Sequence, residues 1–169
     1  MNETIERSNY TLLVIDDDID TIMRWFIQRL KAGGFRVRPC RFFADAVTWL
    51  QEHAATEEEI DGVILDIMLS LRKADEEAYN KVEGHKPRGA TDAMQAGLTL
   101  LPLIRKSLPG VPIFVLTSLP ADTEIGRTVY GKLEKISDVR YIQRKPADDN
   151  FFKFMLELLA KHKGQEEET

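Results

Sequence analysis

The sequence predicts a doubly wound α/β fold, in which helices cover both faces of a five-stranded parallel sheet. Two observations indicate this fold. Short apolar runs rich in β-branched residues alternate along the chain with segments whose apolar residues recur at helical spacing. Several of these runs are apolar at every position, which is typical of strands buried on both faces of a parallel sheet. The chain has 169 residues, of which 43% are hydrophobic and 30% are charged, and this suffices for one domain with a sizeable core.

Five segments are expected to form the strands. Four of them are predicted to be buried on both faces: TLLVI (11–15), GVIL (62–65), VPIFVL (111–116) and RYIQ (140–143). The segment FRVRPC (35–40) has a shorter apolar pattern, in which apolar and polar residues alternate. It contains Pro39, which has no N–H to donate to a neighbouring strand, so we expect this strand at an edge of the sheet.

Helices are expected between the strands. In the first of them, Asp18 or Asp20 would cap the N-terminus, and the apolar face would begin with Ile22 and Trp25. In the third, Pro102 is expected to kink or restart the helix because it lacks an N–H. The segments with helical periodicity are 22–30, 43–50, 98–108, 122–136 and 151–158.

Residues 70–95 do not fit this alternation. They lie between the third strand and the third helix and are rich in charged residues, with Gly84, Pro87 and Gly89 among them. A loop of this length in a compact domain is usually functional or disordered. We expect a mobile surface loop with a helical turn near 74–82, which selects a partner. The chain is thus predicted to be one domain (1–169) with a core at about 10–162, an insertion at about 70–95 and a frayed polar tail at 164–169.

Composition limits the class of partner and the compartment. Lys and Arg number 23 and Asp and Glu number 28, so the net charge of -5 argues against a protein that coats nucleic acid through its phosphates. Cys40 is the one cysteine, so the chain has no internal disulfide and suits a reducing cytosol. Neither a signal peptide nor a run of about 20 apolar residues is present. We therefore expect a cytoplasmic protein that contacts neither nucleic acid nor membrane directly.

Polar residues follow four of the predicted strands. Because the carboxyl ends of parallel strands meet at one edge of the sheet, these residues should converge there. Crowded carboxylates favour a divalent cation with oxygen ligands such as Mg²⁺, and a nearby hydroxyl and ammonium suit a phosphoryl group. The sequence therefore predicts a magnesium and phosphoryl site at this edge. The residues are Asp16, Asp17, Asp18, Asp66, Thr117, Ser118 and Lys145, and Pro146 follows the lysine.

The runs LLVIDD, DGVILDIML, VPIFVLTS and RYIQRKP resemble the receiver domain of two-component response regulators. The resemblance covers roughly residues 10–162 without the insertion. It implies the flavodoxin-like (βα)5 three-layer sandwich of that family. It also implies that Asp66 is the phosphoacceptor, that Thr117 is the switch hydroxyl and that Lys145 pairs with the phosphate, ahead of a cis bond to Pro146.

The same resemblance implies a set of ligands for Mg²⁺. Asp17 would bind the metal directly and Asp16 through the outer shell, while Asp66 and the main-chain carbonyl of Met68 would complete the protein ligands. In the family, the side chains two residues after the phosphoacceptor and two after the switch hydroxyl tune the attack of water. Here these are Met68 and Leu119, which are bulky and apolar, so we expect slow autodephosphorylation.

The sequence departs from the family in three places. Ile142 stands at the aromatic switch position, and Tyr141 comes one residue earlier, an offset that should turn its ring to the other face of the sheet. The chain between Asp66 and the third helix is longer than in the family. Residues 121–139 are also longer and lack the family's Ala-Gly-Ala type of run.

Three functions are compatible with the residues. The first is a phosphoacceptor receiver of a phosphorelay, which takes a phosphoryl group on Asp66 from a histidine kinase or phosphotransfer protein and signals to an output protein by contact. It assists its own phosphorylation and dephosphorylation and is not otherwise an enzyme. The second is a pseudo-receiver that binds partners without being phosphorylated. The third is a haloacid-dehalogenase-type phosphatase with Asp16 as nucleophile and Asp18 as acid/base, which leaves Asp66 without a role.

Overall fold

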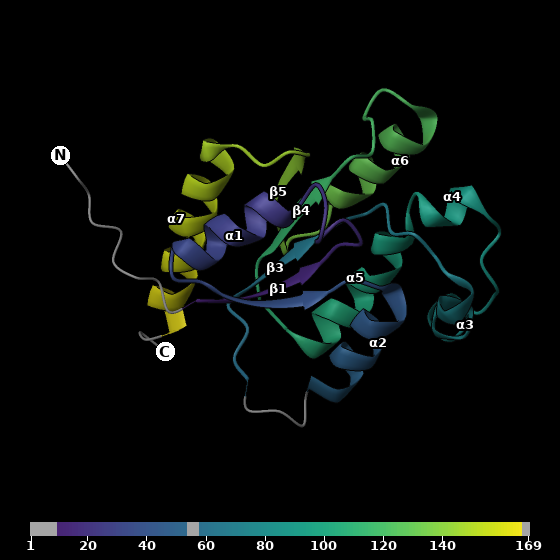
Figure 1. The fold of residues 1–169 in the computed structure, drawn as a ribbon, viewed down its shortest axis with the longest axis horizontal. Coiled ribbons are helices and arrows are strands. Elements are labelled where there is room, and N and C mark those ends of the chain that lie inside the picture. Colours follow the sequence, from purple (N-terminus) through teal and green to yellow (C-terminus); the bar gives the residue numbers. More distant parts are fainter. Residues whose placement is uncertain (1–9, 54–57, 167–169) are drawn as a thin grey trace.

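A computed structural model describes residues 10–53 and 58–166 and contains a five-stranded parallel sheet between two layers of helices (Figure 1). The strand order is β2-β1-β3-β4-β5, and every neighbouring pair is parallel. This is the doubly wound, flavodoxin-like order, and it confirms the predicted fold class. The strands are β1 (Thr11–Ile15), β2 (Arg36–Cys40), β3 (Gly62–Leu65), β4 (Ile113–Thr117) and β5 (Val139–Arg144).

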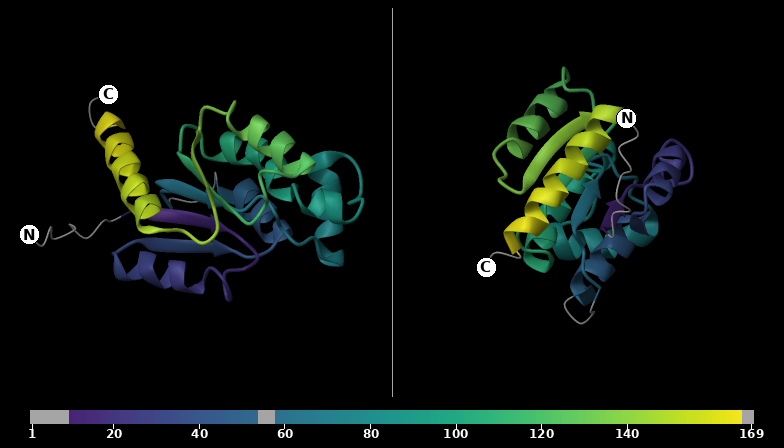
Figure 2. Two further views of the ribbon diagram at one scale, coloured as in Figure 1. Left: turned by 90° about the horizontal axis from the view of Figure 1, so that it is seen from above. Right: turned by 90° about the vertical axis from the view of Figure 1, so that its left-hand side faces the viewer.

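The helices lie on both faces of the sheet (Figure 2). One face packs against α1 and α7, and the other packs against α2, α5 and α6, with α3 outside α2 and α5. The helices are α1 (Arg24–Ala32), α2 (Phe43–Glu52), α3 (Glu76–Glu83), α4 (Ala90–Ala93), α5 (Ala96–Ser107), α6 (Glu124–Leu133) and α7 (Asp149–Glu166), and a short 3₁₀ helix (Lys73–Asp75) precedes α3. Among the described residues, no helix is both long enough and apolar enough to cross a membrane.

The three central strands are buried along their whole length. Because side chains alternate across a strand, Leu13 and Ile15 of β1 enter the core under α2 and α5, whereas Leu12 and Val14 enter the core under α1 and α7. The edge position predicted for residues 35–40 is confirmed, since β2 is an outer strand. The prediction that 140–143 is buried on both faces is wrong, because β5 is the other outer strand and none of its residues is fully buried.

The first helix differs in phase from the prediction. It begins at Arg24, and residues before it form turns in which the Asp18 carbonyl accepts the N–H groups of Thr21 and Met23. The predicted aspartate cap is therefore wrong. Ile22 and Trp25 are 55% and 54% exposed, and the face that packs on the sheet consists of Met23, Phe26, Ile27 and Leu30.

The third predicted helix and the C-terminal helix also run further than expected. α5 continues through Pro102 without restarting, and this proline lies on the exposed side of the helix, away from the sheet. α7 continues through Glu166, so the part of the polar tail that the structure describes is helical; residues 167–169 lie outside the described residues. Cys40 is buried, and the Lys145–Pro146 bond is cis.

The insertion is not a surface loop throughout. The helical turn predicted near 74–82 is confirmed by the 3₁₀ helix and α3, but these elements pack onto the domain. Tyr79 is only 2% exposed, joins the core under α2, and lies with its ring centroid 5.5 Å from that of Phe43. Asp75 is fully buried and accepts the N–H of Ala44 at the start of α2. The segment thus extends the existing core instead of forming a second one, with Leu71, Ala78 and Val82 packed beside Tyr79.

Candidate functional site

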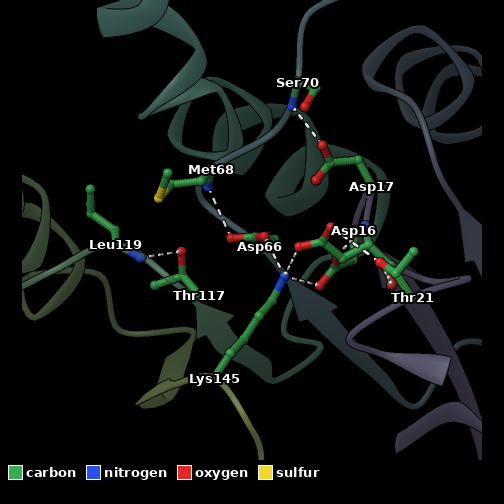
Figure 3. Close-up of polar contacts among 10 residues, drawn as sticks. Asp16, Asp17, Thr21, Asp66, Met68, Ser70, Thr117, Leu119 and Lys145 are labelled. Carbon is green, nitrogen blue, oxygen red and sulfur yellow. Dashed lines mark hydrogen bonds and ion pairs between the residues drawn. The ribbon is translucent and has the colours of Figure 1, made fainter. Parts of the chain in front are cut away.

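The sheet brings the predicted polar residues together at the carboxyl ends of its strands (Figure 3). Ile15 of β1 is paired with Leu65 of β3, so the next residues, Asp16 and Asp66, are neighbours. Thr117 at the end of β4 is paired with Arg144, and its carbonyl accepts the N–H of Lys145 at 2.9 Å. The register of parallel strands thus places an acid, an acid, a hydroxyl and an amine side by side.

Lys145 is the centre of this arrangement. Its side chain is 2% exposed, and its Nζ lies 2.6 Å from Asp66 Oδ2, 2.8 Å from Asp16 Oδ2 and 3.4 Å from Asp18 Oδ2. Burial alone would lower the pKa of this ammonium, but the carboxylates of Asp66 and Asp16 outweigh burial and raise it. Lys145 therefore stays charged and holds the two buried acids together.

The two buried carboxyl groups have perturbed pKa values. Burial and the charge of Asp66 raise the pKa of Asp16 to about 7, against the opposing effect of Lys145. Burial also raises the pKa of Asp66, although Lys145, the hydroxyl of Thr117 and the N–H of Met68 act in the other direction. Asp16 Oδ2 touches Lys145 but makes no hydrogen bond of good geometry among the described residues. The single positive charge of Lys145 therefore does not balance the negative charge of the carboxylates in this cluster.

The acidic cluster fits a divalent cation. Asp16, Asp17, Asp18 and Asp66 each offer a carboxylate oxygen, and these four atoms all lie within 4.8 Å of one another. Asp16 and Asp66 are buried, whereas Asp17 and Asp18 are half-buried at the rim. Such a set of hard oxygen donors, with excess negative charge and partial access to water, suits Mg²⁺. Asp18 belongs to this cluster, although the family resemblance does not assign it as a metal ligand.

Contacts of the main chain position the acids. Asp66 Oδ1 accepts the N–H of Met68 at 2.9 Å, and Asp17 Oδ2 accepts the N–H of Ser70 at 3.0 Å. The first residue of the insertion is thus bonded directly to a predicted metal ligand. That the main-chain carbonyl of Met68 is a metal ligand stays a prediction.

Thr117 links the site to the helix that follows β4. Its side chain is fully buried, and its hydroxyl accepts the N–H of Leu119 at 3.4 Å. The carbonyl of Leu119 in turn accepts the hydroxyl of Tyr130 in α6 at 3.0 Å. Sequence reasoning did not single out Tyr130, since nothing local shows that this helix folds back over the loop.

Ile142 stands at the position of the family's aromatic switch residue, and Tyr141 comes one residue earlier. Their side chains point to opposite faces of the sheet, as predicted. Tyr141 packs on α7, with its ring centroid 5.6 Å from Phe151, whereas Ile142 packs on the face that carries α5 and α6. The aromatic hydroxyl on that face comes from Tyr130 instead. Met68 is half-buried beside Asp66 and Leu119 is fully buried in the core (Figure 3), and that both of them shield the site from water stays a prediction.

Gly97 is a further residue that sequence reasoning missed. It lies in the first turn of α5, and its N–H donates to the carbonyl of Ile67 at 2.9 Å. A Cβ at this position would overlap the carbonyl oxygen of Asp66. Only glycine lets α5 approach the main chain at the end of β3 so closely.

Comparison with known proteins finds similarity in structure alone. No protein-family model and no curated protein sequence matches the chain. Among solved structures, it resembles a CheY-like response regulator receiver domain protein from Methanospirillum hungatei, at 16% identity and a TM-score of 0.61, over 94% of this chain and 99% of that one. It also resembles a signal receiver domain of an HD domain-containing protein from Pseudomonas fluorescens, at 20% identity and a TM-score of 0.60, over 94% and 99% of the two chains.

A third solved structure supports the same likeness. The response regulator receiver protein from Sinorhizobium medicae is 19% identical, with a TM-score of 0.59 over 92% of this chain and 98% of that one. At such low identity the likeness concerns the fold. The chain has the flavodoxin-like fold of response regulator receiver domains.

Proposed function

We propose that this protein is a phosphoacceptor receiver of two-component signalling, phosphorylated on Asp66. The observation that carries the proposal is the environment of this carboxylate, which is buried, 2.6 Å from the ammonium of Lys145 and part of a four-carboxylate cluster. A receiver fold with this set of side chains has each group that phosphoryl transfer to an aspartate needs. It is a signalling domain and not an enzyme that turns over a separate substrate.

The chemistry follows from the positions of these groups. A carboxylate oxygen of Asp66 attacks the phosphorus of a donor, the bond from phosphorus to the donor breaks, and the leaving group takes its electron pair. The ammonium of Lys145 and the hydroxyl of Thr117 then hold the oxygens of the acyl phosphate. Asp16, Asp17, Asp66 and the Met68 carbonyl would hold Mg²⁺, which neutralises charge on the phosphoryl group when bound.

The contacts of Thr117 suggest how the state of Asp66 reaches the surface. Movement of this hydroxyl toward a phosphoryl group changes the position of Leu119, whose carbonyl holds Tyr130. α6 is therefore the element whose position depends most directly on the site. We propose a histidine kinase or phosphotransfer protein as the phosphoryl donor, an output protein as the partner, and the cytoplasm as the compartment.

Intact-mass analysis with acetyl phosphate tests the proposal. We expect one phosphoryl group to be added in the presence of Mg²⁺, little without it, and none in the variant Asp66→Asn. Beryllofluoride should be trapped by Asp66. Trapping by Asp16 would instead support a phosphatase of the haloacid-dehalogenase type, and a folded, Mg²⁺-binding protein that resists labelling by acetyl phosphate and by kinases would be a pseudo-receiver.

A further inference from the structure

A groove runs along the outer face of α5, away from the sheet. It consists of two hollows of about 570 and 290 Å³, and these hollows share Glu83, Thr99 and Pro102. The larger one extends to Lys132 of α6 and the smaller one to Gln51 of α2, and residues of the insertion form the opposite wall. The groove therefore exists only because α3 and the segment after it are folded against the domain.

The lining of the groove is apolar at its base. The apolar residues come from α3, from α5 and from the turn after α6, and each of them is buried or half-buried. Concave surfaces of this size with an apolar base and a few polar groups are typical of ligand sites. The residues are Tyr79, Val82, Leu98, Leu101, Leu103 and Ile136.

The charges around the groove are mainly positive, although the whole chain carries a net charge of -5. Three of the bases are already ion-paired, Arg88 with the buried Asp92, Arg105 with Asp138 and Lys81 with Glu77. Glu83 also lines the groove, and among the described residues Lys106 and Lys132 are the bases of the rim without an ion-pair partner. An apolar base inside a basic rim is complementary to a ligand that is both acidic and apolar. The basic side chains are Lys81, Arg88, Arg105, Lys106 and Lys132.

The main chain of α5 adds an acceptor to this wall. Pro102 has no N–H, so the carbonyl of Leu98 does not receive the bond that residue 102 would donate in a regular helix. Both residues line the groove. A carbonyl in this position can accept an N–H from the main chain of a bound peptide. A nucleic acid is a poorer match, since it has no apolar side chains for the base of the groove.

We propose that this groove binds an acidic peptide segment of a partner protein, with apolar side chains of the segment on the base and its carboxylates on the basic rim. Neither Asp66 nor Thr117 nor Lys145 lines the groove. The groove is complete in the unphosphorylated chain, so peptide binding can be tested apart from the phosphorylation proposed above, and it gives the insertion a function of its own.

Fluorescence anisotropy on the full chain tests this site. The probe is a short fluorescein-labelled peptide that alternates Glu and Leu. We expect saturable binding that weakens with added NaCl. The double variant Lys106→Glu/Lys132→Glu should weaken binding about tenfold or more, because it reverses two charges of the rim. Thr99→Trp, which places a large ring where the two hollows meet, should also weaken it.

Controls separate the groove from general electrostatics. Lys161→Glu makes the same kind of charge change on the exposed face of α7 and should bind as the wild type does. Circular dichroism and melting temperature must match the wild type in each variant. Equal binding of the Lys106→Glu/Lys132→Glu variant and the wild type would overturn the proposal. So would equal affinity for a Lys and Leu peptide, for an acidic peptide of Glu, Gly and Ser, or for oligouridylate, since each would show that the acidic and apolar match is not recognised.

Discussion

Replacing Asp75 with alanine should show how firmly the insertion is attached to the domain. The carboxylate is fully buried and accepts four hydrogen bonds. Two of them come from main-chain N–H groups, that of Ala44 at 2.9 Å and that of Arg72 at 2.8 Å. The other two come from the Arg72 guanidinium, which also lies over the ring of Phe42. Asp75 thus caps α2 from a segment that is distant in sequence.

The size of the effect follows from these contacts. A hydrogen bond to a charged acceptor contributes roughly 1.5 kcal/mol or more, and loss of a helix cap costs about 1 kcal/mol. The ion pair with Arg72 contributes little, because that side chain is 39% exposed and is screened by water. We expect Asp75→Ala to lower the free energy of unfolding by about 3 kcal/mol, which corresponds to a melting temperature lower by roughly 6–12 °C in a chain of this size.

The effect should depend on pH in a defined direction. Burial by itself would raise the pKa of Asp75, but the hydrogen bonds from Arg72 and Ala44 outweigh it, so the pKa in the folded state lies below its ordinary value. A lowered folded pKa means that the stabilisation is complete above the unfolded pKa of about 4 and is lost as the pH falls through the folded value. The difference between wild type and Asp75→Asn should therefore be largest at neutral pH and shrink below about pH 4.

Urea unfolding followed by circular dichroism measures these differences, with Glu77→Ala as the control. Glu77 lies in the adjoining helix α3 and pairs with Lys81, but its side chain is 81% exposed, so its removal should change stability little. If Asp75→Ala were as stable as Glu77→Ala, the carboxylate would not hold the insertion. If the loss of unfolding free energy were the same at neutral and acidic pH, the packing of the Asp75 side chain and not its charge would account for the loss.

Four further predictions concern the site and the insertion. Mg²⁺ should raise the melting temperature of the wild type, and Asp17→Asn should abolish this response if Asp17 is a ligand; an unchanged response would refute the assignment. Autodephosphorylation should be slow, and Met68→Asn should accelerate it by admitting and orienting water; radiolabel loss that is fast in the wild type, or slower in the variant, would contradict the shielding. Gly97→Ala should displace α5 from the Asp66 carbonyl, and we expect a lower melting temperature together with slower labelling by acetyl phosphate, whereas wild-type values for both would show that the main chain adjusts. Replacing 72–93 with a short Gly/Ser linker should destabilise the domain, since this segment contributes buried side chains, and a melting temperature equal to that of the wild type would show that they add nothing.

Much of the candidate site could be predicted from the sequence. The runs that end in Asp16, Asp66, Thr117 and Lys145 are recognisable as strands of a parallel sheet, and the carboxyl ends of such strands must meet at one edge of the sheet. Identifying the strands was therefore enough to bring these four residues together. Local rules also placed β2 at an edge and turned Tyr141 away from the site.

Other features depend on contacts between distant parts of the chain. Which face of α1 packs on the sheet depends on the turns that precede the helix. Met23 is therefore buried, whereas Ile22 was the residue expected to be buried. Three further contacts join residues from different elements. Gly97 lies close to the carbonyl of Asp66, the Tyr130 hydroxyl donates to the carbonyl of Leu119, and Tyr79 packs in the core under α2. Hydrophobic period and strand ends are encoded locally, because they depend on neighbours within a few residues. Packing between elements is not, because its free energy depends on shapes and distances that exist only when the whole domain has folded.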